Sequence, residues 1–338
     1  MQKNIFIILL NWNKNKMTQE CLTSIFSIKN PPFSVVVVDN GSTDESKKEI
    51  PIKFPQIHFI SLSTNLGYAT GNNTGIQYAL DKGADYLLLL NNDTLIDKDL
   101  LSAFLLAATK KERGGIFGGK IFQYNKKNIF DHLGGQWNKK TACFDLIGSN
   151  KKDEGTWNEM KKMDYVCGCC LFIKKEVFEK TGVFDERFFL YWEDADLCFR
   201  AKRKGFDIWF VPQAKLWHKM HKSFPKGKEL AKYFYWRNRL LWIEKNCSKK
   251  EKFFLFVKIL FPQIIKLYKL KFLKSFQLFF LTMTKKKKKI ARTREKFLSY
   301  SFSCLGVKDY FFHRFGKPPL FFTKKNSFQS PKDVIKNK

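Results

Sequence analysis

Short, continuous apolar runs alternate with segments of helical periodicity along the first hundred residues. The apolar runs cover residues 4–10, 33–38, 57–62 and 86–90. Apolar side chains recur at helical spacing over residues 18–28, 70–80 and 100–108. Unbroken apolar strands separated by helices are typical of a mostly parallel sheet that helices cover on both faces. The pattern therefore predicts an α/β fold.

The periodicity weakens in the middle of the chain. Residues 120–165 mix glycine, asparagine, lysine and aromatic residues, so we expect an irregular lobe beside the sheet. Three further elements are predicted after it: a strand at 165–173, a helix at 174–181 and a strand at 206–211 that Pro212 closes.

An aromatic run at residues 188–192 leads into Glu193 and Asp194, at the start of a predicted helix. Carboxylates at this end of a helix are stabilised by its dipole. Behind apolar residues, one of them would be desolvated and able to act as a general base. The alternative is a capped amphipathic helix whose acids, including Asp196, are solvated.

Polar residues follow the predicted strands at their carboxyl ends, where ligands bind in parallel α/β sheets. They are Asn11 and Asn13, Asp39, Asn40 and Ser42, and Asn91 and Asp93. Each of these residue types is also common in turns. Three successive strand ends of this kind nevertheless predict a binding site along one edge of the sheet.

The glycine pattern narrows the choice of ligand. Asn11, Trp12 and Asn13 follow the first strand, where a dinucleotide site requires G-x-G-x-x-G, and the chain has no P-loop. The sequence therefore argues against a nicotinamide-dependent oxidoreductase.

Asp93 follows Asn91 and Asn92 at the end of a strand, where carboxylate and carbonyl oxygens suit a hard divalent cation. Such an ion would hold a diphosphate and stabilise its leaving charge. An Asx turn that caps the helix near Asp97 is the alternative. His218 follows a strand-like segment, and its ring nitrogen would complete a metal site, although a lone histidine is more often structural.

Charge divides the chain into two unequal parts. The net charge is +31 overall, yet residues 1–218 carry 30 Lys and Arg against 25 Asp and Glu, a net of +5. Residues 219–338 carry 32 against 6, a net of +26. A near-neutral domain joined to a very basic one predicts contact with an anionic surface, either membrane or nucleic acid.

Residues 253–281 are rich in Phe, Leu and Ile, with several lysines roughly on one side of a helical wheel and an expected kink at Pro262. A run of five lysines follows at 285–289. These features favour a helix lying in an anionic membrane interface. A helical subdomain packed on the core is the alternative, and no nucleic-acid module accompanies the charge.

Two further observations concern the compartment. The start of the chain lacks the pattern of a signal peptide, and no stretch of 18 apolar residues predicts a transmembrane helix. The eight cysteines are irregularly spaced, with a cluster at Cys167, Cys169 and Cys170. We interpret them as reduced, mostly buried thiols of a cytoplasmic protein, in preference to a metal site.

Five stretches together resemble the family-2 glycosyltransferases with a GT-A fold, especially the bacterial rhamnosyl- and galactofuranosyltransferase-like branch. They are residues 36–44, 65–75, 88–94 and 168–200, and the pair Trp217 and His218. They occur in the family's order over about residues 3–245. The sequence departs from the family at Asn91 and Asn92, because the first acid of a full D-x-D motif is missing.

The resemblance implies a nucleotide-sugar donor and a divalent metal, Mn²⁺ or Mg²⁺. Asp39 is similar to the acid that accepts a hydrogen bond from N3–H of uracil or thymine, and Asn11 and Asn65 match positions near the nucleoside. Asn91 would also bind the donor. Asp93 resembles the acid that holds the metal on the diphosphate, and His218 matches the late histidine that joins that metal.

The resemblance also implies an acceptor side. Asp194 resembles the catalytic base, with Glu193 as the second candidate, and Tyr191 and Trp192 would stack on an acceptor sugar. Arg237 and Asn238 resemble a pair on the family's post-catalytic helix and would face donor phosphates, unless they belong to a salt-bridged surface helix.

The expected protein is an inverting transferase that acts on a lipid-linked or cell-surface glycan at the inner face of a bacterial membrane, and that binds no nucleic acid. A catalytically silent nucleotide-sugar-binding or scaffold protein is the alternative. The expected division is a GT-A domain at 1–245 (donor half 1–115, acceptor half 116–245), a basic helical region at 246–316 and a loosely ordered tail at 317–338.

Overall fold

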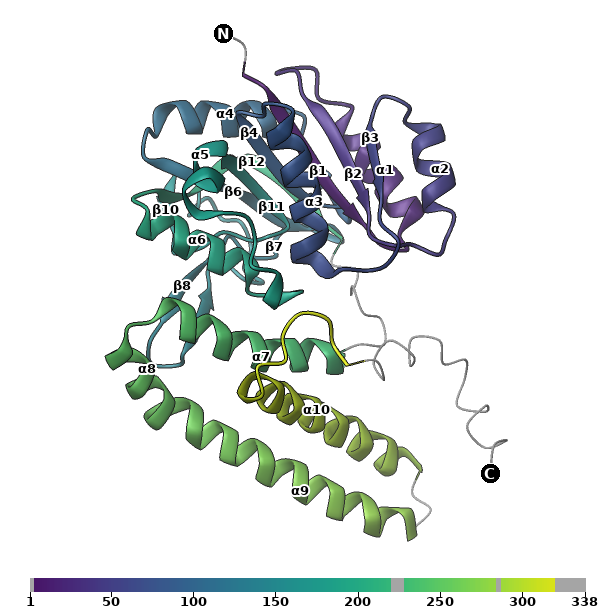
Figure 1. Cartoon of the computed structure of the whole chain (residues 1–338), viewed down its shortest axis with the longest axis vertical. Helices are drawn as coiled ribbons and strands as arrows, with labels where there is room; N and C mark the ends of the chain where they lie inside the picture. Colours follow the sequence, from purple (N-terminus) through teal and green to yellow (C-terminus); the bar gives the residue numbers. More distant parts are fainter. Residues whose placement is uncertain (1–2, 220–227, 284–286, 320–338) are drawn as a thin grey trace.

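The computed structural model describes residues 3–219, 228–283 and 287–319, and its two parts are a sheet-based domain and a helical extension (Figure 1). The described residues form a ten-stranded mixed sheet whose main path runs β10-β12-β6-β11-β4-β1-β2-β3. The α/β prediction is therefore confirmed. The predicted tail lies almost wholly outside the described residues, as do the first two lysines of the run at 285–289.

The first half of the sheet is parallel. Its strands are β1 (Ile5–Asn11), β2 (Ser34–Asp39), β3 (His58–Ser61) and β4 (Tyr86–Asn91). β1 pairs in parallel with both β2 and β4, and β2 pairs in parallel with β3. Asn11 is paired with Asp39, and Leu10 with Asn91, so the polar strand ends meet along one edge.

The helices of this half are α1 (Asn15–Ile25), α2 (Ser46–Lys53), α3 (Gly67–Asp81) and α4 (Leu100–Lys110). Three of them lie where helical periodicity predicts them. The sequence pattern missed α2, whose few apolar positions are interrupted by Pro51.

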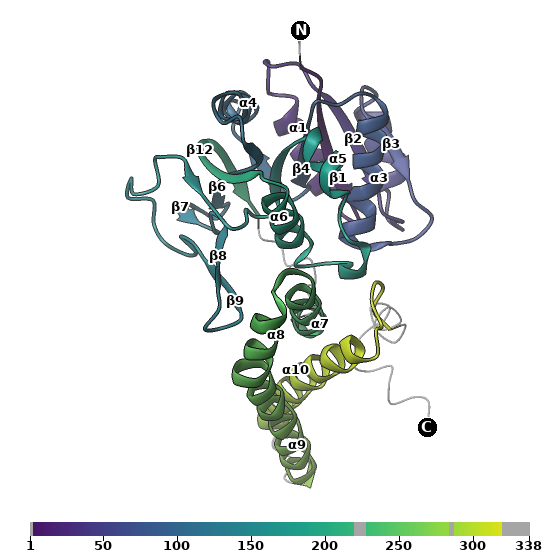
Figure 2. The same cartoon turned by 60° about the vertical axis from the view of Figure 1, so that its left-hand side comes forward.

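Two hydrophobic clusters lie on opposite faces of the sheet because successive side chains of a strand alternate between its faces. Ile5, Ile7 and Leu9 of β1 pack with α1 and α4, whereas Phe6 and Ile8 pack with α3 and α6 (Figure 2). The sheet is thus covered on both faces, so a binding site can form at the carboxyl ends of its strands.

The second half of the sheet is mixed and contains more strand than its sequence indicates. It comprises β5 (Thr94–Ile96), β6 (Gly114–Gln123), β7 (Lys126–Phe130), β10 (Lys161–Lys162), β11 (Cys170–Lys174) and β12 (Asp207–His218), with a separate hairpin of β8 (Gly135–Asn138) and β9 (Cys143–Leu146). The expectation of an irregular lobe at 120–165 is therefore wrong in part. Short strands held by long-range pairing carry little periodicity of their own.

Pro212 does not close the last strand as expected. β12 continues to His218, and its register against β6 shifts between Val211 and Lys215. Proline is tolerated at such an irregularity because no ladder hydrogen bond is required from its nitrogen. The continuation matters, since it carries His218 to the edge of the sheet.

The chain between β11 and β12 forms α5 (Lys175–Thr181), the 3₁₀ turn η1 (Glu186–Phe188) and α6 (Glu193–Arg203). Gly182 ends α5 and Glu193 begins α6, both as predicted.

The helical extension consists of α7 (Lys228–Asn246), α8 (Lys249–Leu255), the π-helical turn η2 (Phe256–Leu260), α9 (Phe261–Met283) and α10 (Lys287–Phe311). The π-turn directly precedes Pro262, which lacks the N–H that an α-helix would need there. α7 packs on α10, and α10 packs on α9. Among the described residues, no helix is long and apolar enough to span a bilayer.

Candidate active site

A cavity of about 680 Å³ opens between the carboxyl edge of the sheet, the start of α6 and one side of α7. Seven of the residues singled out in the sequence line it: Asn91, Asp93, Tyr191, Trp192, Glu193, Asp194 and His218. They come from three separate parts of the chain: the end of β4, residues 191–194 and the end of β12. The fold therefore brings the predicted metal residues and the predicted acid pair to one cavity.

Strand pairing places His218 beside Asp93. β5 and β12 are antiparallel with His218 opposite Thr94, the residue after Asp93. His218 Nε2 lies 3.1 Å from Asp93 Oδ1, and His218 Nδ1 lies 2.8 Å from Asp131 Oδ2. The imidazole is thus held between two carboxylates.

These contacts set the charge of the histidine. Burial alone would lower the pKa of His218, but the hydrogen bonds to Asp131 and Asp93 outweigh it and raise the pKa to about 10. Burial would raise the pKa of Asp131, yet the hydrogen bond with His218 brings that pKa below its usual value. The site therefore stabilises a positive charge between the carboxylates.

The same arrangement fits a divalent cation. Asp131 bonded to Nδ1 would orient the imidazole so that Nε2 points toward Asp93, as carboxylates do for metal-binding histidines. Asp93 and His218 would supply two ligands, leaving further positions for diphosphate oxygens and water, as is usual for Mg²⁺. No cluster of three or more His, Cys, Asp or Glu that could hold a metal occurs in the described ranges.

Asp194 also lines the cavity, from the first turn of α6. Its Oδ2 accepts a hydrogen bond from Gly168 N at 2.9 Å, and its Oδ1 accepts one from Ala195 N at 2.8 Å. Burial, reinforced by the negative charge of Cys167, raises the pKa of Asp194 to about 6. Near neutral pH the group is a carboxylate of increased basicity, as a general base requires.

Glu193 differs from its neighbour. Its side chain is 4% exposed, and Oε2 is buried without a hydrogen-bond partner among the described residues. Burial and the adjacent Asp194 carboxylate raise the pKa of Glu193 well above its usual value. Burial thus favours the neutral form of Glu193 over its carboxylate.

The sequence reasoning missed Asp131 and His132, which follow β7 and also line the cavity. Burial would lower the pKa of His132, but Cys167 and Asp131 outweigh it and raise the pKa to about 9. A hydrogen bond from Cys169 and the proximity of His132 lower the pKa of the Cys167 thiol. The one available signal was a polar pair between the apolar residues Phe130 and Leu133.

Aromatic side chains form one wall of the cavity. Tyr191 is 39% exposed, and Trp192 packs against Phe144 and Tyr235. Tyr165, packed on Phe144, also lines the cavity. The sequence singled out Tyr191 and Trp192; the others come from the hairpin, the segment before β11 and α7.

Arg237 and Asn238 do not face the cavity, contrary to expectation. Arg237 is fully buried and donates to the carbonyl oxygens of Arg187, Phe188 and Gly316. Asn238 Nδ2 donates to those of Phe188, Leu190 and Tyr191. The pair thus holds the aromatic run at residues 188–192 in place. Phe189, Tyr191 and Trp192 of this run have positive φ, an unfavourable conformation for bulky residues.

We expect Asn238→Asp to lower the free energy of unfolding by roughly 2–4 kcal/mol, because three carbonyl oxygens lose their donor and meet a buried carboxylate. Activity should fall too, since the loop leads directly into Glu193 and Asp194. Chemical denaturation of the variant measures the change. Gln56→Glu, the same type of substitution at an exposed turn position, is the control and should leave stability nearly unchanged.

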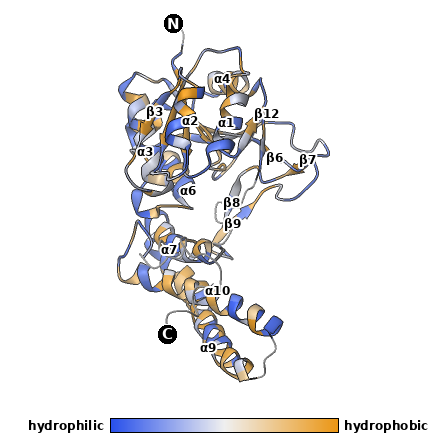
Figure 3. Ribbon diagram, turned by 90° about the vertical axis from the view of Figure 1, so that its right-hand side faces the viewer, coloured by the Kyte–Doolittle hydropathy of each residue, from blue (hydrophilic) through white to orange (hydrophobic). Residues whose placement is uncertain are grey.

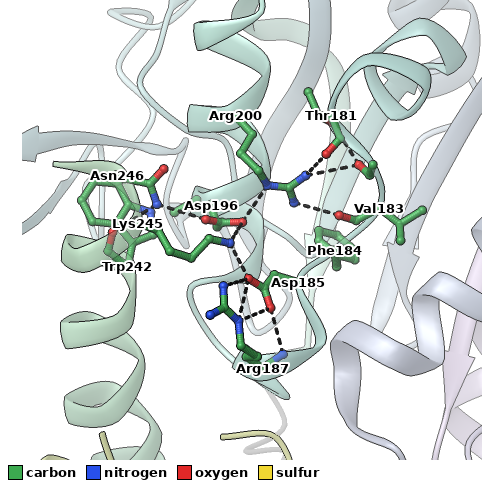
Figure 4. Close-up of polar contacts among 12 residues, drawn as sticks. Thr181, Val183, Phe184, Asp185, Arg187, Asp196, Arg200, Trp242, Lys245 and Asn246 are labelled. Atoms are coloured by element: carbon green, nitrogen blue, oxygen red, sulfur yellow. Dashed lines mark hydrogen bonds and ion pairs between the residues drawn. The ribbon is translucent and has the colours of Figure 1, made fainter. Parts of the chain in front are cut away.

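Asp196 and Arg200, close to the acid pair in sequence, belong to a separate buried network (Figure 4). Asp196 Oδ2 pairs with Arg200 Nε at 2.8 Å and with Lys245 Nζ at 2.9 Å. Arg200 also donates to the carbonyl oxygens of Thr181 and Val183 at the end of α5. The network fixes α6 against α5 and α7, so Asp196 is structural rather than solvated.

Asn11 and Asp39 lie at neighbouring strand ends and Asn65 in the loop before α3, and none of the three lines this cavity. Asn11 Nδ2 donates to Asp39 Oδ1 at 2.7 Å, and Ser42 N donates to Asp39 Oδ2 at 3.0 Å. Asp39 is fully buried. Asn65 is partly exposed and caps the start of α3 through Gly67 N. The cluster adjoins the cavity through Asn92, which donates to Asn11 and Thr18.

Comparison with curated proteins finds several related transferases. The chain is 29% identical over 209 residues to the low-salt glycan biosynthesis hexosyltransferase Agl10 of Haloferax volcanii, covering 62% of this chain and 64% of that protein. It is 26% identical over 251 residues to the N-acetylglucosaminyl-diphospho-decaprenol L-rhamnosyltransferase of Mycobacterium tuberculosis, covering 67% and 79%. The first match spans less than two thirds of that relative's length.

Solved structures share the fold. The mannosyltransferase PcManGT of Pyrobaculum calidifontis, in complex with GDP-Man and Mn²⁺, superposes with a TM-score of 0.55 at 13% identity, covering 92% of this chain and 87% of that one. GalNAc-T7 with UDP, GalNAc and Mn²⁺ superposes with a TM-score of 0.54 at 16% identity, covering 76% and 56%. At this identity the likeness concerns the fold alone.

A family model settles the relationship. It is that of glycosyl transferase family 2, and it matches residues 6–182, which contain the parallel half of the sheet, Asp93 and the strands that position Asp131. The chain belongs to glycosyl transferase family 2, with a GT-A fold.

Proposed function

We propose that the protein is an inverting glycosyltransferase that moves a sugar from a UDP- or dTDP-sugar to a hydroxyl group of a lipid-linked or cell-surface glycan. The observation that carries the proposal is that one cavity is lined both by a basic carboxylate, Asp194, and by the Asp93–His218 pair. A reaction that deprotonates one oxygen while stabilising negative charge on another needs both features.

The acceptor side of the reaction depends on Asp194. Its carboxylate takes the proton of an acceptor hydroxyl as that oxygen forms a bond to the anomeric carbon. The bond from that carbon to the donor phosphate breaks on the opposite face, and the nucleoside diphosphate leaves with the electron pair. A single displacement inverts the anomeric configuration.

The leaving-group side depends on Asp93 and His218. A Mn²⁺ or Mg²⁺ ion held there would act as a Lewis acid on the leaving diphosphate. Asp131 keeps His218 oriented toward Asp93. His132, cationic at neutral pH because of its raised pKa, adds positive charge to the same wall of the cavity.

We place the nucleoside at the adjoining cluster. Asp39 would accept from the pyrimidine N3–H, and Asn11 and Asn65 would flank the nucleoside. Because Asp39 is fully buried against Asn11 and Ser42, the donor must displace part of this hydrogen-bonding shell to reach it. Asn91, which lines the cavity, would then lie toward the diphosphate.

Three observations support the acceptor class and the compartment. The aromatic wall around Trp192 and Tyr191 suits the apolar face of a sugar ring, and the mycobacterial relative is named for a diphospho-decaprenol acceptor. All eight cysteines are free thiols, which favours a reducing compartment such as the cytoplasm.

Donor binding provides the test. We expect thermal shift with UDP-, dTDP- and GDP-sugars to stabilise the protein with one pyrimidine donor class, and only when Mn²⁺ or Mg²⁺ is present. A donor at about 100 times its Kd stabilises the folded state by roughly 2.7 kcal/mol. Hydrolysis of the same donor, followed as nucleoside diphosphate release, tests turnover. A flat response to every donor contradicts the proposal, and binding without turnover supports a silent nucleotide-sugar-binding protein instead.

A further inference from the structure

The α9 helix has two apolar sides, and the described part of the fold covers one of them. Leu267 and Leu281 are buried, and α9 packs on α10. On the other side, large apolar side chains remain exposed at spacings of four, three, four, four and three residues. They are Phe261, Ile265, Tyr268, Phe272, Phe276 and Phe279, here called the aromatic face.

These spacings place the aromatic face along one side of a 23-residue helix. Phe272 is 71% exposed, and Phe276 and Phe279 are 57% and 59% exposed. Phe253 and Phe254 of α8, 73% and 54% exposed, extend the apolar surface toward α7. Figure 3 shows this hydrophobic colouring along α9, which projects together with α10 from the sheet domain. Soluble proteins rarely expose so much contiguous apolar surface without a partner.

The charge around the aromatic face is of one sign. Residues 252–294 contain thirteen Lys and Arg and no Asp or Glu. Lys258, Lys266 and Lys269 are exposed next to the aromatic face. Aromatic residues beside lysines, on a helix too polar to cross a bilayer, describe a helix that lies in an interface containing anionic lipid.

We propose that the aromatic face docks the protein on an anionic membrane, with α9 lying in the plane of the interface. A second copy of the chain fits this surface less well, because a face-to-face dimer would bring Lys266 and Lys269 of both copies together. Nucleic acid would pair with the lysines but would leave the row of exposed phenylalanines uncovered.

The positions of α9 and α10 connect this docking with the cavity. α7 contributes Lys232 and Tyr235 to the cavity wall, and it packs on α10, which packs on α9 (Figure 1). Docking would therefore hold the cavity at a fixed orientation to the membrane. If the proposed transfer reaction is correct, this orientation suits an acceptor whose lipid anchors it in the same bilayer.

Vesicle flotation of the full chain tests the proposal. We expect the protein to float with vesicles of 70% phosphatidylcholine and 30% phosphatidylglycerol, and to bind pure phosphatidylcholine at least tenfold more weakly. The triple variant Phe272→Ser, Phe276→Ser, Phe279→Ser should lose at least tenfold in binding to the anionic vesicles. Lys258→Gln, Lys266→Gln, Lys269→Gln should lose most of the preference for anionic lipid.

Two controls keep the test specific. Ile52→Ser with Leu106→Ser removes exposed apolar side chains from α2 and α4 and should float like the parent. The aromatic-face variant should melt like the parent and respond like it to donor and Mn²⁺. The proposal is overturned if that variant binds the anionic vesicles with the affinity of the parent. It is also overturned if sedimentation equilibrium shows a dimer of the parent that the three serine substitutions dissociate. Vesicle binding by a protein that ignores every donor would leave docking standing while the transferase proposal fails.

Discussion

Asp194→Asn is expected to reduce sugar transfer by about 10²- to 10⁴-fold, the usual contribution of a positioned general base. The amide has nearly the same shape as the carboxylate but cannot accept the acceptor's proton. Donor binding should remain close to that of the parent, because Asp194 is bonded to Gly168 N and Ala195 N and not to Asp93 or His218. Steady-state kinetics, combined with calorimetric titration of the donor, separate the two effects.

Glu193→Gln is the matched control. Burial and the neighbouring carboxylate raise the pKa of Glu193 and so favour its neutral form, which glutamine mimics, and we expect this variant to change transfer less than tenfold. The pH profile provides a second check. Because Asp194 must be deprotonated and its pKa is about 6, kcat/KM should fall tenfold per pH unit below about pH 6 and level off above it. A Glu193→Gln variant that loses as much activity as Asp194→Asn would contradict this assignment of the base.

The strands of the parallel half of the sheet can be predicted from the sequence because they are buried on both sides. β1, β2 and β4 appear as unbroken apolar runs, which is the pattern expected of parallel strands that helices cover on both faces. The polar residue that ends each run then marks the edge where a site forms. The start of α6 is equally clear, since carboxylates follow an aromatic run there.

What the sequence conceals depends on long-range pairing. Asp131 reaches His218 only because β7 pairs with β6 and β12 runs beside β6 beyond Pro212. No local sequence pattern predicts the pairing of β7 with β6 or the continuation of β12 beyond Pro212. Arg237 shows the reverse case, in which a charged residue that looks exposed is buried because it is bonded to the carbonyl oxygens of a strained loop.

Asp93→Asn is expected to abolish most of the metal-dependent activity, with a loss of about 10²-fold or more, because it removes the carboxylate that would compensate the cation beside the donor diphosphate. Asp131→Asn should act more mildly. It leaves Asp93 and His218 in place but weakens the contact that orients the imidazole, a change that typically costs 10–100-fold in metal affinity.

The two variants should therefore respond differently to added cation. Raising Mn²⁺ should restore much of the activity of Asp131→Asn, since only affinity is lost, and should restore little in Asp93→Asn or Asp194→Asn. Mn²⁺ titration in the presence of nucleoside diphosphate, followed by electron paramagnetic resonance, reads the affinity without turnover. Chelation by EDTA should abolish the transfer activity of the parent, and addition of Mn²⁺ should restore that activity. Full activity in EDTA would show instead that protonated His218 and His132 alone stabilise the leaving diphosphate, which their raised pKa values would permit.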